Sequence, residues 1–482
     1  MILHELFHNL SKSQKSSITW NLKRQKEGSK VTVLWEAMWS MKRGVSKEEL
    51  SLKIKDLFSG QHEAKNAVTR LQRVMEQSLI ENYLSKAPFE RKQLEIRAIP
   101  PSLSSKLYRK NLTEATTRFY NSEGRSTKYH LAIHQIELEK VAFQIGEERK
   151  AGKEPVFYQA VKSLDLFYLI SSLRIALADF QAKLAFPEDD FSHTVDFDCL
   201  IHLIEKYKTN PVAMVYLKSI KLCQELSDTN FKEAKTLFMD HFPVLDSGDR
   251  LDVLTMLFNS LTYLSKATPK HAEEYLLEMH RLLEFGISAE VFSSVHPNDH
   301  SPPLNFPIFK NYIEITLRLG LISESEAFWR TYKSVVPPTY QLFAKAQILF
   351  FKEKYEQAWV AIHSLLNQSL NDVFLIVSAN SLAIKSLVEK KDLELAQVYV
   401  KNFSGRITRW KRVRKVNSIY LSKVGSRINM VNELIGILEA GPCREDLLLS
   451  LVRFENRLVE NADKMDDVSW LLGVVSKIKQ EG

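Results

Sequence analysis

Glycine is scarce in this 482-residue sequence. The chain has 15 glycines, about 3% of its residues against a usual share of roughly 7%. Glycine allows the tight turns of many β sheets and the loops that hold phosphate groups, so its scarcity favours helices. The motifs GxxxxGK[ST], GxGxxG and GxSxG are absent, which argues against the nucleotide-binding and hydrolase sites that require them.

Cysteine is also rare. Cys199, Cys223 and Cys443 are odd in number and far apart, with no CxxC pair that could bind zinc or form a redox disulfide. Cys199 and Cys223 lie in apolar helical surroundings, which predicts buried and unreactive thiols. The N-terminus shows no basic segment followed by an apolar run and a cleavage site. Together these features predict a cytoplasmic protein.

Long uninterrupted hydrophobic runs are missing as well. The most apolar segment, residues 156–186, contains Lys162, Asp165, Arg174 and Asp179, whereas a bilayer span needs ~20 predominantly apolar residues. This segment is therefore predicted to be a buried core helix, and no membrane partner is expected. With 45% hydrophobic and 26% charged residues, the composition is typical of a globular protein with a real core.

Helical periodicity dominates the first hundred residues. It predicts helices over residues 31–41, 47–58 and 62–83, an order that resembles a helix-turn-helix or winged-helix arrangement. In the third helix, Lys65, Arg70 and Arg73 lie opposite the apolar face. The tryptophans at positions 20, 35 and 39 are expected to lie in the core rather than to form a stacking platform. The segment IPPSLS at 99–104 breaks the pattern and sets a predicted domain boundary.

A short sequence motif recurs in the rest of the chain. In this motif, an aromatic or apolar residue and an alanine are separated by two residues. Its alanines are Ala234, Ala358 and Ala396, and a degenerate copy lies around Ala327. In a tetratricopeptide unit the alanine lies where the two helices of a pair approach most closely. The 38 residues between Ala358 and Ala396 are close to the ~34-residue period of that repeat.

These patterns predict an all-α fold with two parts. Residues 1–98 form a helical N-terminal module, winged-helix-like in its helix order. Residues 99–482 form a tetratricopeptide-like α-solenoid of antiparallel helix pairs, in which the proline-rich segment 293–307 is an insertion loop.

Several sequence blocks resemble a family of long all-helical bacterial proteins that have tetratricopeptide-like repeats and no assigned activity. The matching blocks are residues 10–15 (LSKSQK), 164–174 (LDLFYLISSLR), 210–216 (NPVAMVY), 309–311 (FKN) with 317–319 (LRL), and the repeat that begins at Tyr355. They follow one another in the right order over nearly the whole length. Leu393 departs from the pattern, because an aromatic residue is usual there. The resemblance implies a fold and brings no ligand residues with it.

Two histidine pairs could suggest a metal. Residues 4–8 (HELFH) match HExxH, in which two histidines bind zinc and the glutamate activates water. Only three residues precede this motif and no third ligand follows at the usual spacing, so an exposed first helix that frays is expected instead. His130 and His134 are also four residues apart, but their apolar neighbours favour ordinary packing. The sequence predicts neither catalysis, nor a cofactor, nor a bound metal.

Basic residues concentrate at two places, although the net charge of the whole chain is only +8. Residues 1–100 carry 18 basic and 11 acidic residues, and residues 401–415 carry seven basic residues and no acidic one. Six cations of that run surround Trp410: Arg406, Arg409, Lys411, Arg412, Arg414 and Lys415. They could bind phosphates while the ring stacks on a base. The alternative is a solvated helix end with Trp410 in the core.

The leading hypothesis for function is a non-catalytic scaffold or adaptor that binds a protein or peptide on the concave face of the repeat array. The first helix of each pair would line this face, through Lys310, Arg318, Gln341, Lys345 and Asn380. The alternative is a regulator that binds nucleic acid through Lys65, Arg70, Arg73 and the basic run. No small-molecule substrate is inferred.

Overall fold

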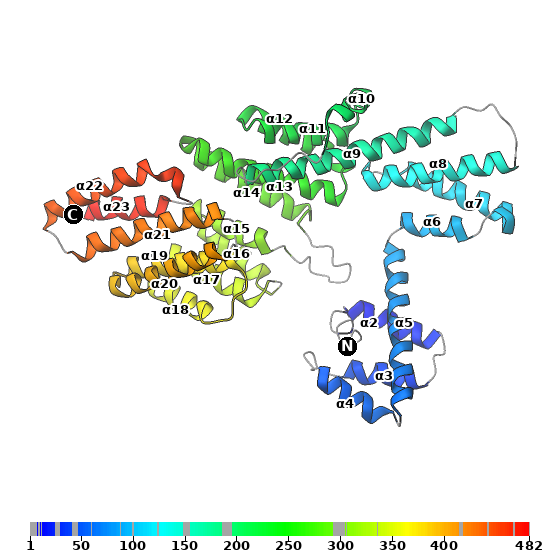
Figure 1. Cartoon of the computed structure of the whole chain (residues 1–482), viewed down its shortest axis with the longest axis horizontal. Helices are drawn as coiled ribbons and strands as arrows, with labels where there is room; N and C mark the ends of the chain where they lie inside the picture. The colour runs from blue at the N-terminus through cyan, green and yellow to red at the C-terminus, as the bar shows by residue number, and fades with distance from the viewer. Residues whose placement is uncertain are drawn as a thin grey trace. The chain divides into compact units, whose positions relative to one another are not determined.

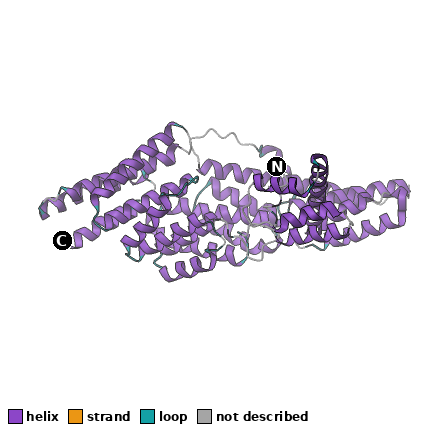
Figure 2. Cartoon of the chain, turned by 90° about the horizontal axis from the view of Figure 1, so that it is seen from below, coloured by secondary structure: helices purple, strands orange, loops and turns teal. Residues whose placement is uncertain are grey.

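A computed structural model shows an all-helical protein (Figures 1 and 2), which confirms the all-α part of the predicted fold class; the solenoid arrangement stays a prediction. It describes residues 7, 10, 12–24, 29–40, 47–58, 60–86, 88–98, 101–122, 125–147, 155–185, 195–292, 304, 306–334, 336–413, 418–440, 443–465 and 468–481. These residues form 22 α-helices and no strand. The chain divides between Pro302 and Pro303 into two compact units, each of which is described by itself.

Unit 1 begins with a small helical core. The helices are α2 (Lys12–Arg24), α3 (Ser29–Ser40), α4 (Lys47–Leu57) and α5 (Gln61–Lys86), and the long α5 packs against the other three (Figure 1). Residues such as Ile18, Leu34 and Leu71 are completely buried between them. The three predicted helices of this region are confirmed. The described part of the module contains no strand that could form a wing, so the winged-helix likeness stays a prediction.

The next four helices continue unit 1. They are α6 (Pro88–Ala98), α7 (Pro101–Tyr120), α8 (Thr127–Glu147) and α9 (Pro155–Ala185), and α8 pairs with α9 along much of its length. Ile96 at the end of α6 shares a buried cluster with Tyr108 and Leu112 of α7. The boundary predicted at residues 98 and 99 therefore falls inside unit 1.

Unit 1 ends with α10 (Ile201–Lys206), α11 (Pro211–Gln224), α12 (Asp228–His241), α13 (Ser247–Ala267) and α14 (Ala272–Ser288). Asn210, Ser227 and Asp246 begin α11, α12 and α13, and each side chain accepts a hydrogen bond from a backbone amide of the first turn. Such N-caps satisfy amides that have no partner within the helix. They explain why these three helices begin at those residues.

Unit 2 is a succession of helices in which each contacts the next. They are α15 (Phe306–Arg318), α16 (Ile322–Tyr332), α17 (Pro338–Phe351), α18 (Tyr355–Leu366), α19 (Val373–Glu389), α20 (Leu393–Arg412), α21 (Ser418–Glu439), α22 (Arg444–Glu460) and α23 (Ser469–Glu481). The first helices of neighbouring pairs also touch, since α15 contacts α17 and α17 contacts α19. Helix-pair packing is thus the organising feature of this unit.

Three hairpins of unit 2 turn in the same way. Gly320, Glu353 and Lys391 follow α15, α17 and α19, and each has a positive φ, between 58° and 74°. In each turn the next backbone N–H reaches a carbonyl five residues back, as from Lys354 to Leu349. This is the helix-ending arrangement in which one left-handed residue satisfies the last carbonyl groups. These left-handed residues lie 33 and 38 residues apart.

A small buried side chain follows each of these turns after five residues. Ala358 and Ala396 are fully buried, as the recurring motif predicts. In the first hairpin this residue is Ser325, also fully buried, whose hydroxyl lies 2.6 Å from that of Thr316. The prediction that Ala327 takes the place of this small residue was wrong, because Ala327 is exposed. Ala234 in unit 1 is likewise buried, at 1% exposure.

Helix α9 is only partly the buried core helix that its composition predicts. Leu169, Ile170 and Leu173 are completely buried, whereas apolar side chains on its opposite face, among them Phe157 and Tyr168, are exposed. Within the described residues, no helix combines the length and the apolar character needed to span a bilayer.

The close helix approach at Ala358 predicts a steric effect of substitution. We expect Ala358→Leu to lower the free energy of unfolding by about 1 to 3 kcal/mol, because a larger side chain must be forced between two packed helices. Ala327→Leu places the same side chain on the exposed face of α16 and should change stability by less than ~0.5 kcal/mol. Urea denaturation of both variants measures the difference. Equal effects would show that position 358 is not a point of close contact.

Candidate functional site

The polar residues predicted to bind a partner lie on the first helices of unit 2, but they differ in accessibility. Arg318 on α15 and Lys345 on α17 are exposed. Lys310 is half-buried, and its Nζ lies 3.6 Å from the Glu314 carboxylate. These three side chains place positive charge on α15 and α17, two helices that contact each other.

The other two predicted contact residues have structural roles. The Gln341 side-chain amide donates a hydrogen bond to the Val336 carbonyl, and its backbone carbonyl accepts one from Trp329. Asn380 is only 8% exposed and donates to the Ile376 carbonyl one turn earlier in α19. Asn380 is therefore not available at the surface. The helical spacing of polar residues could not reveal this, because it does not show how deeply a helix is embedded.

The basic run lies mainly at the C-terminal end of α20. Arg406, Arg409, Lys411 and Arg412 are exposed and form no ion pair with any described residue. Trp410 is 8% exposed and packs in the unit 2 core, so its ring is not presented for stacking. Arg414 and Lys415 lie outside the described residues. The exposed part of the run thus offers charge without an aromatic platform, and cations here also complement the negative end of the helix dipole.

The second predicted set of cations is on α5. Lys65, Arg70 and Arg73 are all exposed on this helix, opposite buried residues such as Leu71. They are charged residues of one amphipathic helix and lie in unit 1, whereas the basic end of α20 lies in unit 2.

Two of the three N-terminal tryptophans are not in the core. Trp35 is 2% exposed, as predicted, but Trp20 and Trp39 are 58% and 43% exposed. Trp39 and Trp35 line a groove of about 360 Å³ between α2 and α3. The Trp35 indole donates a 2.9 Å hydrogen bond to the Thr19 hydroxyl on the other helix. The sequence signal for this groove is weak, because periodicity alone does not show which face of a short helix is covered.

The histidine pairs offer little to a metal. The HExxH motif at residues 4–8 lies outside the described residues, apart from Phe7. His130 is buried, and burial lowers the pKa of its imidazole to about 4. The His134 Nδ1 lies 2.9 Å from the Ala160 carbonyl on α9. In the described part of the chain, no group of three potential ligands includes either of these histidines.

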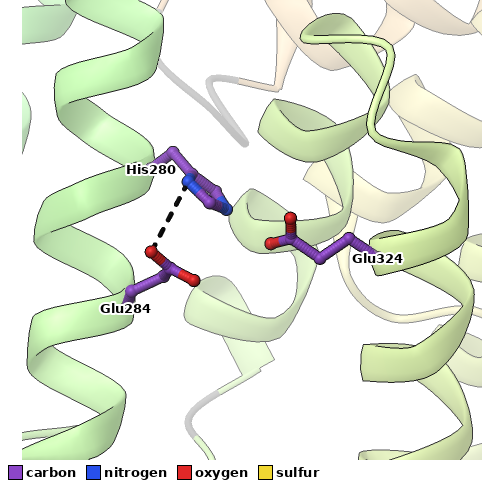
Figure 3. A group of neighbouring side chains, drawn as sticks. All are labelled: His280, Glu284 and Glu324. Carbon is purple, nitrogen blue, oxygen red and sulfur yellow. Dashed lines mark ion pairs between the residues drawn. The ribbon is translucent and has the colours of Figure 1, made fainter.

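A third histidine has a carboxylate neighbour. The His280 Nδ1 lies 3.8 Å from Glu284, one turn later in α14 (Figure 3). Glu324, which is drawn in the same figure, belongs to unit 2 and accepts a hydrogen bond from the Tyr312 hydroxyl. Unit 1 alone therefore contributes two groups at this place, fewer than the three or four protein ligands of a zinc site.

The cysteines differ from their predicted environments. Cys223 is buried as predicted, and desolvation raises the pKa of its thiol to about 12. Cys199 is exposed, so its predicted burial was wrong, because the short helical segment around it covers only Leu200. The Cys199 thiol donates a hydrogen bond of 3.2 Å to the Asp196 carboxylate, which raises the thiol pKa. A thiol whose pKa is raised is a poor nucleophile at neutral pH.

Sequence reasoning missed a buried polar network at the start of α13. Asp249 is completely buried, and one carboxylate oxygen, Oδ1, accepts a 2.7 Å hydrogen bond from the Tyr216 hydroxyl on α11. The other oxygen, Oδ2, is buried without a hydrogen-bond partner. Nearby, the Arg174 guanidinium on α9 lies 2.6 Å from the Asp252 carboxylate. The network thus joins three helices of unit 1.

Burial determines the protonation of this network. Desolvation raises the pKa of Asp249 to about 6, and the negative charge of Asp246 adds to the shift. Burial also raises the pKa of the Tyr216 hydroxyl. A protonated Oδ2 costs less to bury than a charged one, because a charge in a low-dielectric interior lacks solvation. In the sequence, Asp249 looks like an ordinary acidic residue of a first helical turn, and only the tertiary packing reveals it.

No family model, curated protein or solved structure matches the chain. The resemblance to helical proteins with tetratricopeptide-like repeats, found in the sequence blocks, stays a prediction.

The Asp249 network predicts a pH-dependent stability. The pKa of Asp249 in the folded protein, about 6, lies above the ordinary aspartate value of 3.8. The contribution of the protonated carboxyl group to stability is therefore complete below pH 4 and is lost as the pH rises through 6. The full shift corresponds to about 3 kcal/mol. We expect Asp249→Asn to gain stability relative to the native protein between pH 4 and pH 7, as measured by urea denaturation.

The matched control is Asp228→Asn. Asp228 also accepts a 2.7 Å hydrogen bond from a tyrosine, Tyr275, but it is exposed. The free energy of unfolding of this variant should change with pH in parallel with that of the native protein over the same range. A parallel profile for Asp249→Asn as well would contradict a titrating buried carboxyl group.

Proposed function

We propose that the protein is a non-catalytic scaffold whose second unit binds a protein or peptide partner. The supporting observation is the recurrence of one turn and one small buried residue in three successive helix hairpins. Hairpins that repeat in this way stack side by side as a tetratricopeptide-like solenoid, and such arrays use the first helices of the pairs to line an extended concave face. An extended face suits a peptide or helix better than a small substrate.

The first helices carry suitable side chains for such a partner. Arg318 and Lys345 provide exposed charge, while Phe351 at the end of α17 and Phe374 at the start of α19 are 40% and 55% exposed. Aromatic anchors surrounded by charged residues are typical of protein-binding surfaces. The proposed partner is therefore a segment that combines apolar side chains with acidic ones.

Site-specific photo-crosslinking in the native cell tests this proposal. A photoreactive phenylalanine analogue at Lys345 should give a discrete crosslinked species that contains a second protein, because this exposed residue of a first helix belongs to the proposed concave face. The control carries the analogue at Val459, which is 63% exposed on α22. The proposal fails if position 345 yields no protein adduct, or if both positions yield the same set of adducts.

A nucleic-acid ligand is the second candidate function, and the exposed cations on α20 favour it. Arg406, Arg409, Lys411 and Arg412 lie within two helical turns and form no ion pair with described residues. Four cations in this arrangement could contact successive phosphates. Because Trp410 is buried, binding would depend on charge rather than on base stacking.

Binding of random duplex and single-stranded oligonucleotides across a salt series tests this candidate. Each lost phosphate contact lowers the slope of log K against log salt by about 0.7 to 0.9. Arg409→Ala with Arg412→Ala should therefore lower the slope by about 1.4 to 1.8. Lys232→Ala removes an exposed lysine from α12 of unit 1 and should leave the slope unchanged. Absence of binding at low salt would exclude the candidate.

A further inference from the structure

Helix α9 has an exposed apolar stripe that none of the described residues of unit 1 covers. Phe157, Val161, Leu164, Tyr168 and Ile175 are between 44% and 61% exposed. The opposite face, which includes Leu169 and Leu173, packs against α8 and α11. A helix that is apolar all round is normally buried on all sides. We therefore expect a partner to cover the exposed stripe.

The spacing of this stripe is that of a coiled-coil seam. Steps of four and three residues alternate along one line of α9 that contains no charged residue. The line consists of Phe157, Val161, Leu164, Tyr168, Ser171, Ile175, Ala178 and Ala182. It covers almost four heptads and about 38 Å of helix. A regular seven-residue repeat indicates a second helix lying alongside.

The residue types in the seam point to a parallel pair of identical helices. In heptad notation Val161, Tyr168 and Ile175 occupy a positions, and Phe157 and Leu164 occupy d positions. β-branched residues at a together with leucine at d favour parallel two-stranded coiled coils. Val161 and Ile175 at a and Leu164 at d fit this pattern, and in a parallel pair each seam residue meets its own copy.

The charges beside the seam favour the same arrangement. Arg174 occupies a g position, and Asp179 occupies the following e position. In a parallel pair, each g residue faces the e residue five positions later on the partner helix. Arg174 would therefore face the Asp179 carboxylate of the second copy. Arg174 already lies against Asp252 in its own chain, and its five N–H donors allow a second carboxylate. An antiparallel pair would place the row of Asp165 and Asp179 against itself.

We infer that the protein forms a homodimer through a parallel α9–α9 coiled coil about a two-fold axis. This interface lies in unit 1 and is independent of the partner surface proposed for unit 2. Each apolar layer of the seam, from Phe157 to Ala182, then contacts the same layer of the second copy. The exposed face of α9 becomes buried, as the composition of the helix requires.

Sedimentation equilibrium of the full-length protein, over roughly 1 to 100 μM, tests the inference. The native protein should be a dimer. Leu164→Glu and, separately, Ile175→Glu should raise the dimer dissociation constant more than about tenfold, because each places two carboxylates opposite each other in one apolar layer. Val459→Glu changes an apolar residue of unit 2 that is 63% exposed, and it should leave association unchanged. Circular dichroism establishes that each variant keeps its helices.

A cysteine crosslink tests the direction of the helices. Ala178→Cys, with the exposed Cys199 and Cys443 replaced by serine, should form a disulfide-linked dimer on mild oxidation, because a parallel pair brings position 178 against itself. Lys183→Cys, exposed on α9 but outside the seam, should not crosslink. A native monomer, dimers that survive both Glu substitutions, or no crosslink at position 178 would each overturn the inference.

Discussion

The close approach of two helices at a small side chain is the constraint on which unit 2 depends. Ala358 and Ala396 are fully buried five residues after a left-handed turn residue, and Ser325 takes the same place in the preceding hairpin. A larger residue there would separate the helices and disturb the contact between neighbouring hairpins, because protein interiors have little free volume. The turn ends the first helix of each hairpin, and the small residue allows the second helix to pack closely against its neighbours.

The sequence predicts the helices well but their faces less well. Hydrophobic periodicity locates α3, α4 and α5 to within three residues, since a 3.6-residue period repeated over several turns is a strong signal. The choice of Ala327 over Ser325 failed for a chemical reason. A buried serine is as suitable as alanine when its hydroxyl has a partner, and here the Thr316 hydroxyl lies 2.6 Å away. A search for alanine alone could not find it.

Burial explains the other differences between prediction and structure. Trp20 and Trp39 are large apolar residues that remain exposed, whereas Asn380 and Asp249 are polar residues that are buried. In each case the deciding factor is the neighbouring helix, which a single sequence does not reveal. The exposed stripe of α9 is the clearest example. Its composition predicts burial on all sides, and the described residues of unit 1 cover only one side.

We propose that the first helices of the unit 2 hairpins form the binding face for a protein partner. Hydrogen–deuterium exchange of the full-length protein, with and without a partner captured from the native cell, measures which helices the partner covers. Exchange should slow along α15, α17 and α19 in the complex, while exchange along α16 and α18 should stay unchanged. Protection confined to the basic end of α20, or to the N-terminal helices of unit 1, would contradict it.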